Sequence, residues 1–186
     1  MGQNLRTFLS DIIREHPSDF ISVEKEVDPR FGITAFLEKF EEQKLAPVLF
    51  FSKVKGTEIP VVTNVHASFD RLALSMGTKG RPEAVLEFAR RAAEPIQPRV
   101  VKSGSVKDVV LKEGKAQLSL LPQITHNELD GGPYICSAGT IIRHPDTGVY
   151  NVGLYRNQLR GNRIGLMMNP TSESWCEWCS RRPATM

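Results

Sequence analysis

The segment TGVYNVGLYR, Thr147–Arg156, contains turn residues followed by a run that favours extended structure. Alternate side chains of a strand share a face, so Asn151, Gly153 and Tyr155 are expected to point one way and Arg156 the other. A glycine inside a strand marks a bulge or a place where a backbone or a ligand comes close. An amide oxygen, a bare backbone and a guanidinium suit a metal-bridged phosphate. The spacing alone favours a plainer interpretation, a half-buried strand with a surface arginine, because short patterns match by chance.

The preceding segment favours the functional interpretation of this strand over the structural one. LPQITHNELDGGPYI, Leu121–Ile135, followed by Thr147–Arg156, resembles the UbiD-like decarboxylase family. Its members are reversible (de)carboxylases of unsaturated and aromatic acids that use prenylated FMN. The resemblance is strong over Leu121–Gly161, looser over Leu5–Gly114, and ends near Pro170. It implies an α+β fold, in which an N-terminal mixed α/β lobe precedes the first strands of a split β-barrel, a flavin-reductase-like cofactor domain that is truncated here.

The resemblance also assigns residues. Asn151 matches the asparagine that binds the divalent metal bridging to the flavin phosphate, and its amide oxygen suits Mn²⁺ or Mg²⁺. K⁺ is a further candidate cation. Leu154, Tyr155 and Arg156 match the segment that contacts the prenylated flavin. Arg156 also matches the arginine of a catalytic Glu–Arg–Glu network, whose two glutamates, like the metal-binding glutamate, have no counterpart in this chain.

Hydrophobic periodicity outlines the order of elements. Apolar residues at helical spacing predict helices over residues 4–13, 33–43, 70–76 and 82–91. Runs of β-branched and aromatic residues predict strands over residues 21–27, 47–51, 59–63, 134–143 and 163–168. Val109–Leu121 is expected to be a strand–turn–strand unit, and Asp146–Gly148 to turn the strand 134–143 back into the one that carries Arg156. The expected domains are 1–101, an N-terminal α/β domain, and 102–171, a partial β-barrel that binds prenylated FMN.

Composition excludes several classes of protein. The 186 residues, 40% of them hydrophobic, are enough to bury a core. The net charge of +3 comes from interspersed acids and bases, which gives no footprint for nucleic acid. No apolar run approaches the roughly 20 residues of a membrane span, and the first ten residues do not resemble a secretion signal. Three cysteines do not make a disulfide framework, so we expect a reduced, cytoplasmic protein.

Other potential ligands have plainer interpretations. His126, Glu128 and Asp130 alternate as a metal or acid–base cluster would, but the following Gly-Gly-Pro favours a loop shaped by hydrogen bonds and salt links. His66 is expected to be structural. Cys136, in a predicted strand, is expected to be a small buried hydrophobe. The Cys-x-x-Cys pair Cys176 and Cys179 lacks the second ligand pair of a zinc site, so its spacing is expected to be accidental.

The functional prediction is part of a carboxy-lyase that reversibly decarboxylates a small aromatic or α,β-unsaturated carboxylic acid. The chain is expected to be inactive alone, and the intact enzyme to be a homo-oligomer. A non-catalytic accessory or assembly subunit is the alternative, and a pseudogene product without function is a third. Ser172–Met186 shows no helix or strand period, so it is expected to be a disordered, non-family tail from out-of-frame translation or a truncated gene.

Overall fold

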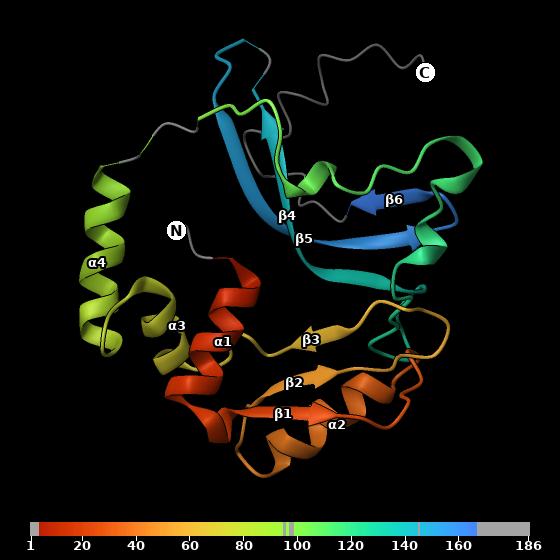
Figure 1. The fold of residues 1–186 in the computed structure, drawn as a ribbon, viewed down its shortest axis with the longest axis horizontal. Helices are drawn as coiled ribbons and strands as arrows, with labels where there is room; N and C mark the ends of the chain where they lie inside the picture. Colours follow the sequence, from red (N-terminus) through yellow and green to blue (C-terminus); the bar gives the residue numbers. More distant parts are fainter. Residues whose placement is uncertain (1–3, 95, 97–98, 145, 167–186) are drawn as a thin grey trace. The chain divides into compact units, whose positions relative to one another are not determined.

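The chain forms two compact units, Met1–Ala116 and Gln117–Met186, each described by itself (Figure 1). The computed structural model describes residues 4–94, 96, 99–144 and 146–166. The predicted tail, 172–186, and its two cysteines lie outside the described residues. Both units combine small sheets with helical segments or loops, so the mixed α+β class is confirmed.

The first helix, α1 (Leu5–Glu15), begins at a capping box. The Asn4 side chain accepts a hydrogen bond from the Thr7 backbone N–H, and the Thr7 hydroxyl accepts one from the Asn4 N–H. This exchange satisfies two of the N–H groups that a helix start leaves without partners. One face of α1 buries Phe8 and Ile12. The helix ends before the single turn η1 (Pro17–Asp19), as the proline predicts.

A three-stranded sheet forms the centre of the first unit. Its order is β1 (Phe20–Val23), β2 (Val48–Phe51), β3 (Val61–Thr63), as Figure 1 shows. β1 and β2 are parallel and are joined through α2 (Gly32–Glu42), whereas β2 and β3 are antiparallel. The predicted strand 21–27 is shorter than expected, since its end makes only an isolated bridge from Val27. The residues of β2 are all apolar, because this central strand is covered on both faces.

Two further helices follow β3. α3 (Phe69–Met76) begins at Ser68, whose hydroxyl accepts from a backbone N–H, and ends at Gly77 with φ 72°, where a side chain would be strained. α4 (Arg81–Ala93) has its proline in the first turn, where the missing N–H costs nothing. His66, in the β3–α3 connection, stacks on Phe8 with ring centroids 5.4 Å apart, which is the structural role expected of it.

The prediction of a strand–turn–strand unit over Val109–Leu121 is wrong. The segment contains only single turns of 3₁₀ helix, η3 (Glu113–Lys115) and η4 (Leu118–Leu120), and η2 (Ser105–Lys107) precedes it. Its β-branched residues favour strands, but a strand forms only against a partner that accepts its backbone hydrogen bonds. Val109 is 76% exposed and Val110 is 62% exposed, so neither side chain lies on the buried face of a sheet.

The second unit contains an antiparallel sheet in the order β4 (Tyr134–Arg143), β5 (Tyr150–Arg160), β6 (Arg163–Leu166). The predicted hairpin is confirmed, and the predicted strand 134–143 has the bounds of β4. Gly148 adopts φ 71° in the turn between the two long strands. The register shifts between Ile135 and Ala138, which marks a β-bulge in β4.

Candidate cofactor and carboxylate site

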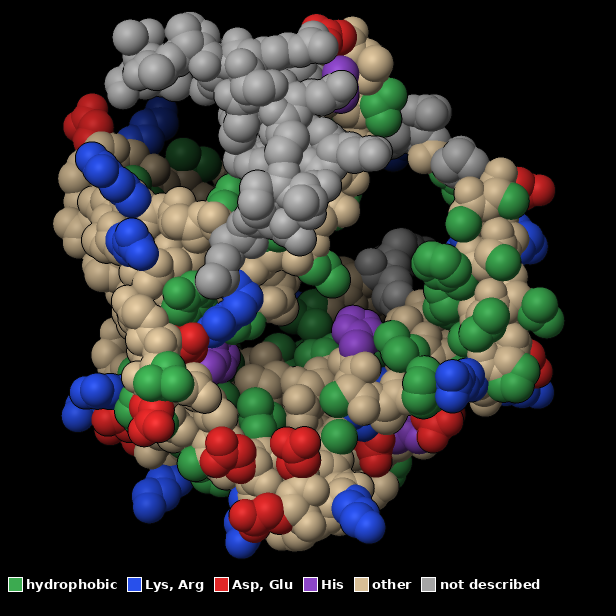
Figure 2. Space-filling view, turned by 180° about the vertical axis from the view of Figure 1, so that it is seen from behind, with side chains coloured by type: hydrophobic (Ala, Val, Ile, Leu, Met, Phe, Trp, Pro, Cys, Tyr) green, Lys and Arg blue, Asp and Glu red, His purple; other side chains and the backbone are tan. Residues whose placement is uncertain are grey.

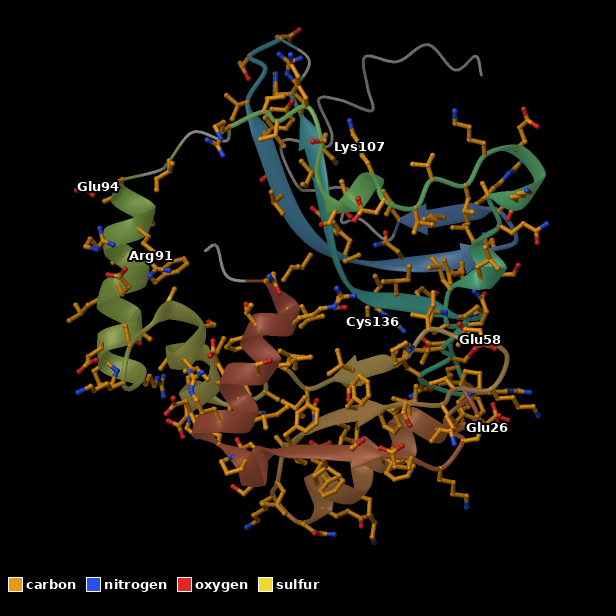
Figure 3. The ribbon with its side chains drawn as sticks, in the orientation of Figure 1. Glu26, Glu58, Arg91, Glu94, Lys107 and Cys136 are labelled. Atoms are coloured by element: carbon orange, nitrogen blue, oxygen red, sulfur yellow. The ribbon has the colours of Figure 1, made fainter. Side chains whose placement is uncertain are left out.

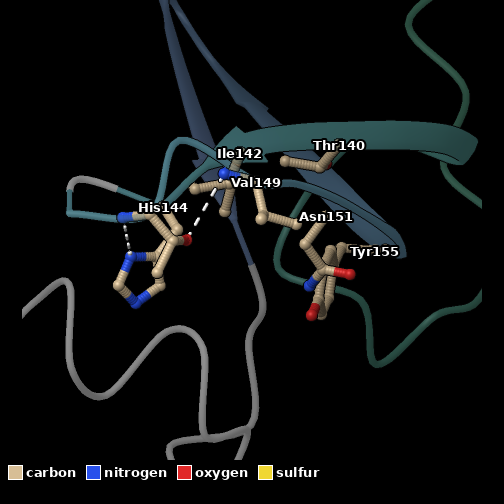
Figure 4. Close-up of a pocket in the computed structure, with 8 residues that line it drawn as sticks. Thr140, Ile142, His144, Val149, Asn151 and Tyr155 are labelled. Carbon is tan, nitrogen blue, oxygen red and sulfur yellow. Dashed lines mark hydrogen bonds between the residues drawn. The ribbon is translucent and has the colours of Figure 1, made fainter. Parts of the chain in front are cut away.

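Asn151 and Tyr155 lie on one face of β5, as strand alternation predicts (Figure 4). That face forms a hollow of about 300 Å³ between β5 and the facing residues of β4. The register places Asn151 opposite Ile142 and Gly153 opposite Thr140. The hollow has amide, hydroxyl and imidazole groups beside apolar ones, and its lining residues are Thr140, Ile142, His144, Thr147, Val149, Asn151, Gly153 and Tyr155.

Gly153 is required by the ring of Tyr155. A Cβ at position 153 would lie 2.2 Å from a ring carbon of Tyr155 and 2.9 Å from its hydroxyl oxygen. The ring therefore lies over the bare backbone of its own strand. The sequence predicted a close approach at this glycine, and the group that approaches is the aromatic side chain two residues on.

His144 was not singled out from the sequence, yet it lines the hollow and shapes its edge. Its Nδ1 accepts hydrogen bonds from the backbone N–H groups of Asp146 and Thr147, each at 3.2 Å. A ring nitrogen that accepts carries no proton, so the neutral ring has its proton on Nε2. The signal that could have indicated this role is the turn composition of residues 144–148, in which a side chain caps backbone donors.

Arg156 lies on the opposite face of β5, as expected. Its Nη2 donates to Oδ2 of Asp130 at 2.8 Å, and its guanidinium carbon lies 4.1 Å from the centroid of the Tyr134 ring. The Asp130 side chain is 10% exposed and that of Arg156 is 39% exposed. The arginine is therefore fixed by an almost buried acid and an aromatic face, while part of it stays open to solutes.

The electrostatics follow from this pair. The hydrogen bond from Arg156 holds the pKa of Asp130 below its ordinary value, and the hydrogen bond to Asp130 raises the pKa of Arg156. Burial lowers the pKa of His126, which lies in the same loop. Asp130 also accepts from the backbone N–H of Asn127, so the expectation of loop-shaping hydrogen bonds and salt links is confirmed for this residue.

The prediction that Cys136 is a buried hydrophobe is wrong. The residue is exposed on β4, where Figure 3 labels it. The bulge between Ile135 and Ala138 interrupts the alternation of side chains, so the strand pattern no longer fixes the face that Cys136 occupies. A hydrogen bond with its side chain also contributes to the raised pKa of Arg156.

The structure thus divides the predicted site residues between two faces of one strand. Asn151 and Tyr155 share the hollow, whereas Leu154 and Arg156 lie on the other face. Leu154 is 82% exposed. A flavin-sized ligand that touched all four residues would have to lie across or around β5. The strand would then fix the positions of all four side chains relative to the ligand.

Asn151 can supply one ligand to a metal ion. The described residues contain no cluster of three or more His, Cys, Asp and Glu side chains that could hold one. The amide of Asn151 and the hydroxyl of Thr140 in the same hollow are the hard oxygen donors that Mn²⁺ and Mg²⁺ prefer. The donor chemistry of these two side chains fits such an ion.

Two family domains account for most of the chain. Residues 13–91 match the 3-octaprenyl-4-hydroxybenzoate carboxy-lyase N-terminal domain, and residues 99–182 match the Rift-related domain of the same enzyme. The chain belongs to the UbiD-like decarboxylase family. The second match runs to residue 182, twelve residues beyond Pro170, near which the resemblance was expected to end.

Some of the curated relatives carry the names of decarboxylases that act on different acids. The chain is 34% identical over 176 residues to a phenolic acid decarboxylase of Sedimentibacter hydroxybenzoicus, covering 88% of this chain and 36% of the relative. It is 30% identical over 168 residues to an anhydromevalonate phosphate decarboxylase of Methanothermobacter thermautotrophicus, covering 89% of this chain and 36% of the relative. The chain thus spans little more than a third of the length of these proteins.

Solved UbiD-class structures share the fold. The UbiD-class enzyme HmfF from Pelotomaculum thermopropionicum, in complex with FMN, superposes with a TM-score of 0.82 at 32% identity, covering 95% of this chain and 39% of that one. The closed form of the vanillic acid decarboxylase of Sedimentibacter hydroxybenzoicus gives a TM-score of 0.81 at 32% identity, covering 91% and 38%.

The distribution of surface charge and the lengths of the helices agree with what the composition predicts. On the face shown in Figure 2, Lys and Arg side chains of the described residues are interspersed with Asp and Glu. Among these residues, no helix is both long enough and apolar enough to cross a bilayer.

Proposed function

We propose that this chain supplies the N-terminal part of a carboxy-lyase that reversibly decarboxylates a small aromatic or α,β-unsaturated carboxylic acid with prenylated FMN and a divalent metal. The observation that carries the proposal is the β4–β5 hairpin, which presents Asn151 and Arg156 from one strand. UbiD-class relatives that bind FMN or prenylated FMN support the cofactor. The sheet of the second unit would be the opening of a split, flavin-reductase-like β-barrel.

Each residue has a role in this proposal. The amide oxygen of Asn151 would hold Mn²⁺ or Mg²⁺, and K⁺ is a further candidate ion. Leu154, Tyr155 and Arg156 would contact the flavin. When bound, prenylated FMN supplies the electron sink for the departure of CO₂. Arg156 binds the substrate carboxylate through two parallel N–H groups and keeps its charge throughout, because guanidinium groups do not deprotonate in proteins.

The same geometry excludes Asp130 as the proton donor to the product. Asp130 is the acid that contacts Arg156, but the lowered pKa keeps it ionised at neutral pH. It can hold Arg156 but cannot protonate a carbanion there. We therefore infer that protonation depends on acids outside this chain, and that the isolated chain does not turn over.

The surroundings of the intact enzyme are part of the proposal. We place it in the cytoplasm, as a homo-oligomer without a nucleic-acid partner. The even spread of charge supports the last point, and a UbiD-class relative described as an evolved dimeric form supports an oligomer.

Cofactor loading tests the function. The 186-residue chain would be produced with prenylated FMN and Mn²⁺, and the bound flavin measured by absorbance and the metal by electron paramagnetic resonance. We expect flavin and metal to bind together, and Asn151→Ala to lose at least tenfold in metal affinity. Asn162→Ala, in the β5–β6 turn, is the matched control and should bind as the parent chain does. Equal metal binding by both variants would refute the role of Asn151.

The alternative is a non-catalytic accessory subunit of a multi-subunit (de)carboxylase. It is favoured by exposed apolar side chains on the hairpin, since Ile141, Val152 and Leu154 are each more than 60% exposed and could contact another chain. A chain that binds no flavin but raises the activity of a separate family decarboxylase would establish this alternative.

A further inference from the structure

The loop 125–133 is joined to β5 by several contacts besides the ion pair. The Gln158 side-chain amide donates to the Gly131 carbonyl at 2.8 Å, and the Leu159 backbone N–H donates to Pro133 O at 2.9 Å. A Cβ at Gly131 would lie 2.9 Å from the Gln158 nitrogen. These contacts hold the loop against β5, the strand that carries Arg156.

Asp130 is itself fixed within this loop. Its backbone N–H donates to the Asn127 carbonyl at 3.1 Å, and its Oδ2 accepts from the Asn127 backbone N–H at 3.2 Å. The reciprocal bonds hold the carboxylate in place whether or not Arg156 is bound to it. With its side chain 10% exposed, Asp130 is poorly placed for binding solutes but well placed for contacting a neighbour.

Arg156 needs such a neighbour. A free arginine side chain at a strand end has many rotamers, and carboxylate recognition requires its planar group in one orientation. The Tyr134 ring, 4.1 Å from the guanidinium carbon, fixes the plane, and Asp130 fixes the rotation within that plane through Nη2. A guanidinium carries five N–H donors, so the contacts with Asp130 and the Cys136 side chain orient the group without exhausting it.

We propose that Asp130 is a positioning residue for Arg156, holding the guanidinium over Tyr134 so that its other N–H groups meet a ligand carboxylate in one orientation. The ligand part of this inference rests on the proposed function. Because Asp130 already balances the charge of Arg156, an entering carboxylate is selected by the fit of its two oxygens more than by net attraction. A loosely held cation would instead bind small anions without preference.

The orientation of Arg156 can be observed directly by nuclear magnetic resonance of the ¹⁵N-labelled 186-residue chain. A guanidinium held on one nitrogen rotates slowly and gives separate Nη signals, which the loss in Arg156→Lys would assign. We expect resolved Nη signals in the parent chain, their loss in Asp130→Asn, and unchanged backbone signals along β4 and β5. Glu128→Gln, which removes the same charge from an exposed residue of the same loop, should keep the Arg156 signals.

Each result decides the inference. Averaged Arg156 signals in the parent chain, unchanged signals in Asp130→Asn, or an equal loss in Glu128→Gln would overturn it. A simple structural role for Asp130 would disturb the β4 and β5 signals as well, and that pattern would also count against it.

Benzoate separates this inference from the proposed function. If the function is right, benzoate should shift the Arg156 signals of the parent chain in a saturable way, with at least tenfold weaker binding in Asp130→Asn. A chain whose Arg156 is ordered by Asp130 but binds neither benzoate nor prenylated FMN would retain the positioning role and lose the proposed function.

Discussion

The two units each contain an arginine that contacts an aspartate, and the two residues differ in what surrounds them. Arg71, in α3, is 1% exposed and donates to the Asp19 carboxylate and to the carbonyls of Ala46, Asn64 and Val65. Arg156, in β5, is fixed by an acid and an aromatic ring and remains partly exposed.

The difference shows how one side chain can serve structure in one place and binding in another. The donors of Arg71 are directed at the Asp19 carboxylate and at the carbonyls of Ala46 and Asn64, so it joins η1 to the segments before β2 and after β3. Arg156 has its orientation fixed by fewer contacts, and its exposure leaves room for an external acceptor. A buried arginine with four of its five donors bound to protein acceptors is not placed to bind a ligand, whereas a positioned and accessible one is.

The largest expected effect is on stability and concerns Arg71. Arg71→Met should destabilise the first unit by roughly 3–5 kcal/mol, because it leaves Asp19 and several carbonyls without their donor. Urea unfolding followed by circular dichroism would measure it. Arg14→Met, at a side chain 65% exposed, is the control and should change stability by less than about 1 kcal/mol. A loss at Arg71 as small as that of the control would mean that its network contributes little.

The next effect concerns the hollow. Gly153→Ala should cost about 1–3 kcal/mol, because a methyl group there forces the Tyr155 ring off the strand. The ring would no longer line the hollow, so flavin loading should fall too. Gly139→Ala, in the paired strand, is the control, since its Cβ would meet its neighbour at an ordinary 3.7 Å. Thermal unfolding and flavin absorbance give both readouts, and equal behaviour of the two variants would contradict the packing argument.

Arg156→Ala sharpens the contrast with Arg71. Its removal leaves the almost buried Asp130 carboxylate without its partner, but Arg156 itself is 39% exposed, so we expect a loss of about 1–3 kcal/mol, smaller than at Arg71. Its removal should nevertheless abolish the saturable benzoate shift of neighbouring signals in the spectrum of the second unit. If the variant unfolds like Arg71→Met, Arg156 is a structural residue and the contrast fails.

The smallest effect is the pH dependence of the Asp130–Arg156 pair. Because the folded pKa of Asp130 is lowered, the stabilisation from this carboxylate is present above the ordinary aspartate pKa and is lost as the pH falls through the folded value. Cys136 contacts Arg156, and His126, whose pKa burial lowers, lies in the same loop as Asp130. The resolved Arg156 signals should therefore survive the titration of His126 and disappear only at lower pH. Their loss together with His126 would show that the histidine, not Asp130, controls the arginine.

Local patterns predicted the elements whose stability is local. The bounds of β4 and the start of α1 follow from alternation and from the cap at Asn4, and both are encoded within a few residues. The family resemblance, not the spacing, indicated Asn151 and Arg156. Their division between the two faces of β5 follows from alternation alone.

The errors came from contacts that no local pattern contains. Val109 and its neighbours have strand composition, but the described chain offers them no partner strand. The exposure of Cys136 depends on a bulge that the strand composition does not reveal. Two of the partners of Arg71, Asp19 and Ala46, come from distant segments, so its burial could not be read from α3.

The hairpin also sets the order in which the site forms. Ile142 and Asn151 are paired across a short turn, so the β4–β5 platform needs only neighbours along the chain. Isolated hairpins close in about 1–10 μs, whereas contacts such as that of Arg71 with Asp19, 52 residues apart, must wait for a longer chain to fold back. During synthesis, the strand that bears Asn151 and Arg156 can therefore pair as soon as β5 has emerged from the ribosome, before any later segment exists to use it.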